Sequence, residues 1–216
     1  LLIGAGWNEP EYTGYDLMER GRGMPSAKER VDRFKEALQI LRGMFDNDVF
    51  SYEGKYWTLR DAINLPPTVQ KPMRISVGAT KPRMIRIAAK YADGLNTGGG
   101  LDSLAKVKGI LVPALERNGK RLEDYYFSGF AAQVTVNGSD EEYDATAKRI
   151  AERSKRSIED VKGDVFSGTP EALVEKFRRA EDLGVKMMVV YIRTSTNIEE
   201  MKQRLSRFND EVIREL

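Results

Sequence analysis

Cysteine and histidine are both missing from the 216 residues of this chain. The absence of cysteine excludes disulfides, thiolate metal sites and a cysteine nucleophile. Without histidine as well, most ligand sets for transition metals and the commonest general base are missing. Proton transfer is therefore left to Asp, Glu, Tyr, Lys and Arg. We expect chemistry that depends on a bound organic cofactor, and no metal site.

Long apolar runs and blocks of like charge are also missing. No apolar run approaches the roughly 18 residues of a membrane span, and no basic-then-apolar signal segment opens the chain. The 35 basic and 33 acidic residues are interspersed, without the basic block typical of nucleic-acid binders. With 41% apolar and 31% charged residues, the composition is that of one globular domain. We therefore expect a soluble, cytoplasmic, single-domain protein over residues 1–216, with neither a nucleic acid nor a membrane as its partner.

Short apolar runs alternate with amphipathic segments along the chain. The runs predict five strands, at residues 1–6, 75–78, 94–97, 127–136 and 185–192. Helices are predicted between and after them, with starts near Ser26, Pro82, Asp102, Ser139, Pro170 and Asn197. Because the runs are continuously apolar, without a half-buried alternation, they indicate a parallel sheet covered by helices. The pattern alone leaves a barrel and an open doubly wound sheet as alternatives.

Local signals mark several helix ends and turns. Ser26 and Glu29 form a capping box, in which each side chain can accept a hydrogen bond from the other residue's backbone amide. Thr80 is predicted to cap a helix whose first turn holds Pro82. Residues 49–57 predict a small hairpin around a Glu-Gly turn. Residues 7–25 are predicted to be a polar connection, and residues 153–162 give no clear pattern.

A succession of short motifs runs through the sequence. These motifs are Gly4-Ala5-Gly6-Trp7-Asn8-Glu9, Glu29-Arg30-Val31-Asp32-Arg33-Phe34, Tyr52-Glu53-Gly54-Lys55-Tyr56, Ile75-Ser76-Val77-Gly78, Ala92-Asp93-Gly94-Leu95-Asn96 and Gly168-Thr169-Pro170-Glu171. No single motif is specific. Their collinear order, over nearly the whole chain, resembles the luciferase-like monooxygenase family, especially its coenzyme F420-dependent oxidoreductase branch.

This resemblance implies an α/β fold of the luciferase-like (β/α)8 TIM-barrel type, in which residues 1–6 would be the fourth strand. About strands 4 to 8 with their helices would then be present, and five strands cannot close an eight-stranded barrel. An open barrel exposes a sheet edge and apolar interior surface. We therefore expect a chain without the N-terminal strands, whether a fragment, a naturally abridged barrel or a protomer completed by another chain, and we expect a homo-oligomer.

In barrels of this kind, ligands lie at the C-terminal ends of the strands, which selects four stretches here. In the first, the resemblance places Gly6, Trp7 and Asn8 beside an isoalloxazine-type ring, which Asn8 can hydrogen-bond. Glu9 or Glu11 could relay a proton, so Glu9 and Asn8 are the catalytic candidates. The alternative is a capped strand end with solvated carboxylates.

The second stretch is a turn of small residues that leads into a helix. Gly78, Ala79, Thr80 and Lys81 lie at the N-terminus of that helix, where free amides and the helix dipole favour an anion. A flavin or F420 phosphate fits such a site, and Thr80, Lys81 or Arg83 could add charge-assisted contacts. The alternative is an ordinary capped helix.

The last two stretches supply one candidate each. Thr97, in the glycine-containing stretch 96–99, is a further candidate for cofactor binding, with a plain loop as the alternative. Arg193, after the final strand, could pair with an anionic substrate or a cofactor tail, or could instead balance Glu199 at the surface. Trp57 could pack on a ring, but an interpretation as loop core is favoured.

The function that the resemblance implies is oxidation or reduction of a small organic substrate with coenzyme F420. The deazaflavin carries a hydride at its C5 position, and the protein supplies orientation and phosphate binding. The first alternative is an FMN-dependent monooxygenase that uses O2 and reduced flavin from a flavin reductase partner. The second alternative is a non-catalytic, flavin-binding abridged barrel. Part of the family's site, on the first three strands, lies outside these residues.

Overall fold

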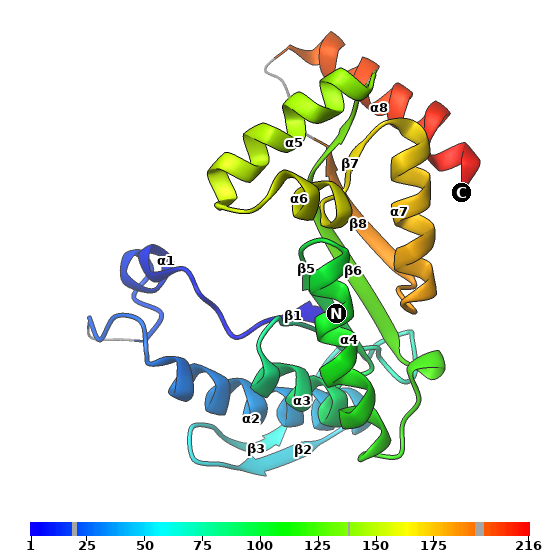
Figure 1. The fold of residues 1–216 in the computed structure, drawn as a ribbon. Helices are drawn as coiled ribbons and strands as arrows, with labels where there is room; N and C mark the ends of the chain where they lie inside the picture. Colours follow the sequence, from blue (N-terminus) through cyan, green and yellow to red (C-terminus); the bar gives the residue numbers. More distant parts are fainter. Residues whose placement is uncertain (19–20, 138, 193–196) are drawn as a thin grey trace. The chain divides into compact units, whose positions relative to one another are not determined.

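The structure is a computed structural model, and it describes residues 1–18, 21–137, 139–192 and 197–216, without the side chains of residues 132 and 133. Two compact units divide the chain: an N-terminal unit, Leu1–Leu95, and a C-terminal unit, Asn96–Leu216. Figure 1 colours the chain from blue to red, so that the N-terminal unit runs from blue into green. Each unit is described by itself.

Two short parallel strands are the centre of the N-terminal unit. β1 (Leu2–Ile3) pairs with β4 (Ser76–Gly78) in parallel, with Ile3 opposite Val77. A short helix, α1 (Glu9–Gly14), follows β1, and α3 (Pro82–Tyr91) follows β4. The core of this unit is small; its fully buried side chains include Leu38, Ile75, Val77, Ile85 and Leu95.

The long helix α2 (Ala27–Asp46) forms where the capping signal and the apolar period predicted it. Ser26 accepts a hydrogen bond from the amide of Glu29 at 3.2 Å, which is the expected half of the capping box. The other half is absent, because the Glu29 carboxylate instead accepts from Arg33 Nε at 3.0 Å. Phe34 and Leu38 are the buried apolar side chains of this helix.

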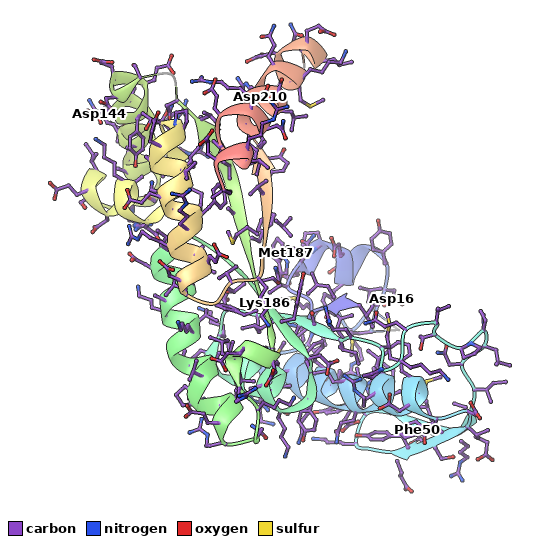
Figure 2. The ribbon with its side chains drawn as sticks, turned by 90° about the vertical axis from the view of Figure 1, so that its right-hand side faces the viewer. Asp16, Phe50, Asp144, Lys186, Met187 and Asp210 are labelled. Carbon is purple, nitrogen blue, oxygen red and sulfur yellow. The ribbon has the colours of Figure 1, made fainter. Side chains whose placement is uncertain are left out.

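A hairpin of β2 (Phe50–Glu53) and β3 (Thr58–Ala62) lies along α2. Figure 2 shows Phe50 in this light-blue hairpin, next to the blue helix. The carboxylate of Glu36, on α2, accepts from the amides of Lys55 and Tyr56 at 3.0 and 2.9 Å. A hairpin is present as predicted, but its second strand lies after residue 57, beyond the predicted range, and a helical carboxylate holds its turn in place.

The start of α3 differs from the prediction. Pro82 occupies the first turn as expected, but the N-cap residue is Lys81, and no side chain caps the helix. Thr80 as the capping residue is therefore wrong: the proline places the first helical turn one residue too late for the Thr80 hydroxyl to reach its amides. Met84, Ile85 and Ala88 are buried beneath this helix, while Ile87 is only half-buried.

β5 (Gly94–Gly98) runs across the division between the units, and the C-terminal unit continues with α4 (Leu101–Glu116) and a long strand, β6 (Tyr126–Val136). β6 pairs in parallel with β8 (Met187–Ile192) along its length, and its end pairs with β7 (Ser167–Gly168). The remaining helical elements of this unit are η1 (Leu122–Asp124), α5 (Asp140–Ser154), α6 (Ile158–Asp164), α7 (Pro170–Asp182), α8 (Ile198–Glu211) and η2 (Ile213–Glu215).

The predicted elements of this unit are present, and α6, β7 and the short helices η1 and η2 are additional to them. Ser139, Thr169 and Asn197 cap α5, α7 and α8 through their side chains, as their positions indicated. Helix α6 lies in the stretch that gave no clear pattern, and β7 is only two residues long. Figure 1 shows α6 below α5, where the two helices enclose a small apolar cluster that contains Ala147 and Val161.

The last strand corrects one expectation. The continuous apolar run at residues 185–192 predicted burial on both faces, yet Met187, Val189 and Tyr191 are 42%, 42% and 48% exposed. Their neighbours along the strand are half-buried, so β8 alternates after all. The physical reason is that one face of this strand has no dense layer of side chains over it. Leu205 of α8 is likewise half-exposed.

Two buried charged groups brace the C-terminal unit. The ammonium of Lys176 donates to the carbonyls of Val165 and Ser167 and to the hydroxyl of Tyr143, at 2.7, 2.9 and 2.9 Å. The carboxylate of Asp164 accepts from Arg156 at 2.6 Å and from the amide of Asp102, in the first turn of α4, at 2.8 Å. These contacts tie α4, α5, α6, β7 and α7 together. Over the described ranges, no helix combines the length and apolarity needed to cross a membrane.

Candidate functional site

Two strand ends that consist of glycine, without side chains, lie next to each other at one edge of the N-terminal unit. Because β1 and β4 are adjacent and parallel, the chain leaves both at the same edge, through Gly4 and Gly78. A Cβ atom on Gly4 would lie 3.7 Å from the carbonyl oxygen of Gly78, and one on Gly78 would lie 3.8 Å from that of Ile3. The first two predicted stretches are therefore brought together, with no side chain between their strand ends.

The segment after β1 carries the catalytic candidates. Gly6 has φ +73°, and a Cβ there would lie 2.5 Å from the hydroxyl oxygen of Tyr12, so the turn requires glycine. Trp7 is 83% exposed, and Glu9 is exposed at the start of α1. The side-chain amide of Asn8 donates to the carboxylate of Glu11 at 2.8 Å. Asn8 and Glu9 both lie at the strand end, and their catalytic roles stay predictions.

The segment after β4 contains main-chain amides without hydrogen-bond acceptors. In the described part of the chain, the amides of Ala79, Thr80 and Lys81 have no hydrogen-bond acceptor, and Thr80 and Lys81 are exposed. Arg83, which could add a positive charge, is instead paired with Asp32 of α2. The hydrogen bonds from Lys28 and Arg83 hold the pKa of Asp32 below its usual value. This stretch can bind an anion through its backbone, with Lys81 as the adjacent cation.

A cavity of about 550 Å³ lies beside the first strand end, between the strand, α1 and α2. Its polar wall contains Arg22, Arg30 and Arg33, together with Glu11. The remaining lining is Gly4, Ala5, Gly6, Tyr12, Leu17, Met18, Pro25, Phe34, Ala37 and Trp57. The sequence reasoning missed these arginines. The signal that could have found two of them is their spacing, because residues 30, 33, 34 and 37 share one face of a helix.

The third stretch belongs to the C-terminal unit and is less open than its glycines suggested. Thr97 is 1% exposed, and its hydroxyl has no hydrogen-bond partner among the described residues. The N-terminus of α4, just beyond it, is closed by the carboxylate of Asp164. A Cβ on Gly100 would lie 2.2 Å from the carbonyl oxygen of Asp164, so this approach needs glycine. A cofactor contact through Thr97 stays a prediction.

The fourth stretch is outside what the structure shows. The candidate substrate-binding residue, Arg193, lies outside the described residues. Within those residues, no group of three or more acidic side chains is placed to hold a metal ion. The candidate site features described above therefore lie in the N-terminal unit. They are a strand edge without side chains, main-chain amides without acceptors and a cavity with a basic wall.

Comparison with known proteins identifies the class to which this arrangement belongs. The sequence profile described as luciferase-like monooxygenase matches residues 1–164. The chain therefore belongs to the luciferase-like monooxygenase family, and the recognition made from its motifs is confirmed.

The individual relatives include both F420-dependent dehydrogenases and monooxygenases. An F420-dependent glucose-6-phosphate dehydrogenase of Microbacterium testaceum is 35% identical over 106 residues, which are 48% of this chain and 31% of the relative. A pyrimidine monooxygenase, RutA, of Methylobacterium radiotolerans is 31% identical over 129 residues, which are 56% of this chain and 32% of the relative. The matched stretches thus span about a third of each relative's length.

A solved structure confirms the fold class. An F420-dependent secondary alcohol dehydrogenase, in complex with an F420-acetone adduct, superposes with a TM-score of 0.75 at 16% identity. The match covers all of this chain and 69% of that one. The predicted α/β fold of the luciferase-like barrel type is therefore confirmed, with this chain corresponding to about two thirds of the complete structure.

Proposed function

We propose that this chain forms part of an oxidoreductase that binds coenzyme F420 and transfers hydride between it and a small organic substrate. The observation that carries the proposal is the strand edge at Gly4 and Gly78, which has no side chains, next to the amides of residues 79–81, which have no acceptor among the described residues. A flat ring can approach backbone where no Cβ intervenes, and a phosphate can accept from exposed amides at the start of a helix. The relatives named for F420 support the choice of cofactor.

Different residues of this chain would contact the ring and the phosphate of F420. The amides of Ala79, Thr80 and Lys81, with the Thr80 hydroxyl and the Lys81 ammonium, would hold the phosphate. Gly6, Trp7 and Asn8 would lie beside the ring. Bound F420 would supply the hydride chemistry. The exposed carboxylate of Glu9 would give or take the accompanying proton, because the chain has no histidine for that task.

An FMN-dependent monooxygenase is the second candidate, favoured by the likeness to pyrimidine monooxygenase RutA. It would need O2 and a flavin reductase as a partner, whereas the F420 enzyme needs neither. Anaerobic hydride transfer from reduced F420 distinguishes them, because the monooxygenase should show none. A homo-oligomer stays a prediction for both. A barrel that binds a flavin without turnover would show cofactor binding, but neither hydride transfer from reduced F420 nor oxygenation with reduced FMN and O2.

Fluorescence titration with F420 and, separately, with FMN tests the cofactor site. We expect Thr80→Pro, which removes an amide and a hydroxyl, to weaken F420 binding at least tenfold, or roughly 1.4 kcal/mol. Thr80→Ala is the matched control: it removes the hydroxyl alone and should weaken binding clearly less. An unchanged dissociation constant in Thr80→Pro would place the phosphate elsewhere. Binding of neither cofactor would reject both enzyme proposals for this chain.

A further inference from the structure

We propose that the cavity beside β1 binds the negatively charged group of a small substrate, and that Arg30 is the residue that recognises this charge. This inference rests on the proposed function, because the cavity opens at the same strand end as the cofactor site. It adds a class of substrate, a phosphate- or carboxylate-bearing molecule with an apolar or ring body. It also adds a specificity-determining residue on α2.

The charges around the cavity do not cancel. Arg33 binds Glu29 at 3.0 Å, and Arg22 lies 3.7 Å from the same carboxylate, so one acid serves two arginines. Glu29 is not part of the described lining; the acid that is, Glu11, accepts a hydrogen bond from the neutral Asn8 side chain. Within the described residues, Arg30 has no carboxylate partner, and its guanidinium donates only to the carbonyl oxygen of Pro25. Positive charge is therefore in excess, and it is centred on Arg30.

The excess positive charge lies where a ligand in the cavity could contact it, because of the position of Arg30. The residue is half-buried on the face of α2 that lines the cavity, so its cation has lost part of its hydration. A guanidinium carries five donors in a planar fork, and the carbonyl of Pro25 uses one nitrogen of that fork. A partly buried cation with open donors is stabilised by a bidentate anion, and carboxylate and phosphate both match the fork.

The remaining residues of the cavity lining indicate what the rest of the ligand is like. Tyr12, Phe34 and Trp57 contribute aromatic surface to the cavity. The guanidinium of Arg33 lies 4.7 Å from the ring centroid of Tyr56 and 5.9 Å from that of Trp57, which holds both rings against α2. A volume of about 550 Å³ is within the usual range for small-molecule sites. The ligand therefore combines one anionic group with a ring or a short apolar body.

The experiment uses the two tryptophans of the chain, Trp7 and Trp57, of which Trp57 lines the cavity. In a Trp7→Phe background, fluorescence of Trp57 is followed during titration with phenyl phosphate and benzoate, and with benzyl alcohol as the neutral analogue. We expect both anions to bind at least tenfold more tightly than the alcohol. The ratio between the two anions shows which group fits better. Equal binding of anion and alcohol, or no binding of either anion, overturns the proposal.

Substitution at Arg30 locates the charge. We expect Arg30→Met to weaken binding of the anions at least tenfold and Arg30→Lys to weaken it less, while binding of the alcohol stays the same. Arg86→Met, at an exposed arginine of α3 outside the cavity lining, is the matched control and should bind the anions normally. Circular dichroism shows whether each variant is folded. Unchanged anion binding in folded Arg30→Met overturns the proposal, and Arg30→Lys supplies the test if the methionine variant does not fold.

Titration of the unchanged chain and of Arg30→Met with F420, both with Trp7 in place, separates this inference from the proposed function. If Arg30 serves a substrate, F420 binds Arg30→Met as tightly as the unchanged chain. A tenfold loss of F420 affinity would instead mean that Arg30 holds the cofactor's own phosphate, and it would overturn the substrate assignment. Failure of F420 to bind the unchanged chain would reject the proposed function, whereas the charge selectivity at Arg30 would still be measured by the phenyl phosphate titration.

Discussion

Arg30 in the N-terminal unit and Lys176 in the C-terminal unit are both cations removed from bulk water, but their surroundings differ. The ammonium of Lys176, in a residue that is 5% exposed, has three oxygen acceptors within 2.9 Å. The guanidinium of Arg30 has one carbonyl acceptor and faces a cavity. A buried cation whose donors are all used braces the fold, whereas one with open donors beside a cavity is available to a ligand.

The same contrast holds for the two units as wholes. In the C-terminal unit, large fully buried side chains such as Phe127, Phe166 and Leu173 form the core. The buried Asp164 is paired with Arg156, and the buried Lys176 is held by three neutral oxygen acceptors. The N-terminal unit has a smaller core, a glycine strand edge and main-chain amides without acceptors among the described residues. The proposed ligand contacts thus lie where the packing is least complete, which is usual for binding sites carried on a rigid scaffold.

The largest effect on stability is expected from Asp164→Ala. It removes the nearer carboxylate of Arg156, leaving only Asp102 at 3.9 Å, and it removes the acceptor at the N-terminus of α4, so it should lower the free energy of unfolding by about 3 kcal/mol. Asp124→Ala removes an exposed partner of Arg121 and is the control, with an expected change within about 0.5 kcal/mol. Urea unfolding followed by circular dichroism measures both. Similar effects in the two variants would show that the buried pair does not brace the unit.

Lys176 gives a prediction for pH dependence. Burial lowers its pKa from 10.5 to about 8, so between these two values the unfolded chain binds more protons than the folded one. The free energy of unfolding should therefore rise as the pH increases from 8 to 10.5, by about 3 kcal/mol in this group's contribution. In Lys176→Met, this rise should disappear. Parallel stability curves for the two proteins over that range would contradict the assignment.

A pair of helix glycines tests the packing of each unit. A Cβ on Gly43 of α2 would lie 2.1 Å from the ring of Phe50, so Gly43→Ala should destabilise the N-terminal unit by about 2 kcal/mol. Gly109 of α4 has open space around it, and Gly109→Ala should stabilise its helix by about 1 kcal/mol. Tryptophan fluorescence reports the first variant, because Trp7 and Trp57 both lie in that unit, and circular dichroism reports the second. The same sign in both would contradict the packing described.

Features that depend on neighbouring residues were predicted well. The helix starts near Ser26, Ser139, Pro170 and Asn197 and the five main strands all follow from local patterns, and the structure contains them. Two predictions of this kind were wrong for identifiable reasons. Pro82 moved the start of α3 beyond the reach of the Thr80 hydroxyl, and β8 alternates because its two faces are covered unequally.

Features that depend on distant segments could not be predicted in this way. The partner of Arg83 is Asp32, and the residue that closes the N-terminus of α4 is Asp164, which follows it by about sixty positions. The Lys176 cluster was not foreseen, because its acceptors include two main-chain carbonyls whose direction depends on the fold. For the candidate site, the strand ends were found from the sequence, whereas the cavity wall of arginines was not.

The sequence by itself determined the family, the order of strands and helices, the lack of histidine and cysteine, and the two glycine-containing strand ends that should face a ligand. These follow from composition, periodicity and short motifs, which are local properties of a chain. Only the tertiary structure decided that those ends lie side by side and that Glu29 is shared by two arginines while Arg30 keeps open donors. The physical reason is that ion pairing and hydrogen bonding depend on distances of a few ångströms between groups that the sequence alone does not place.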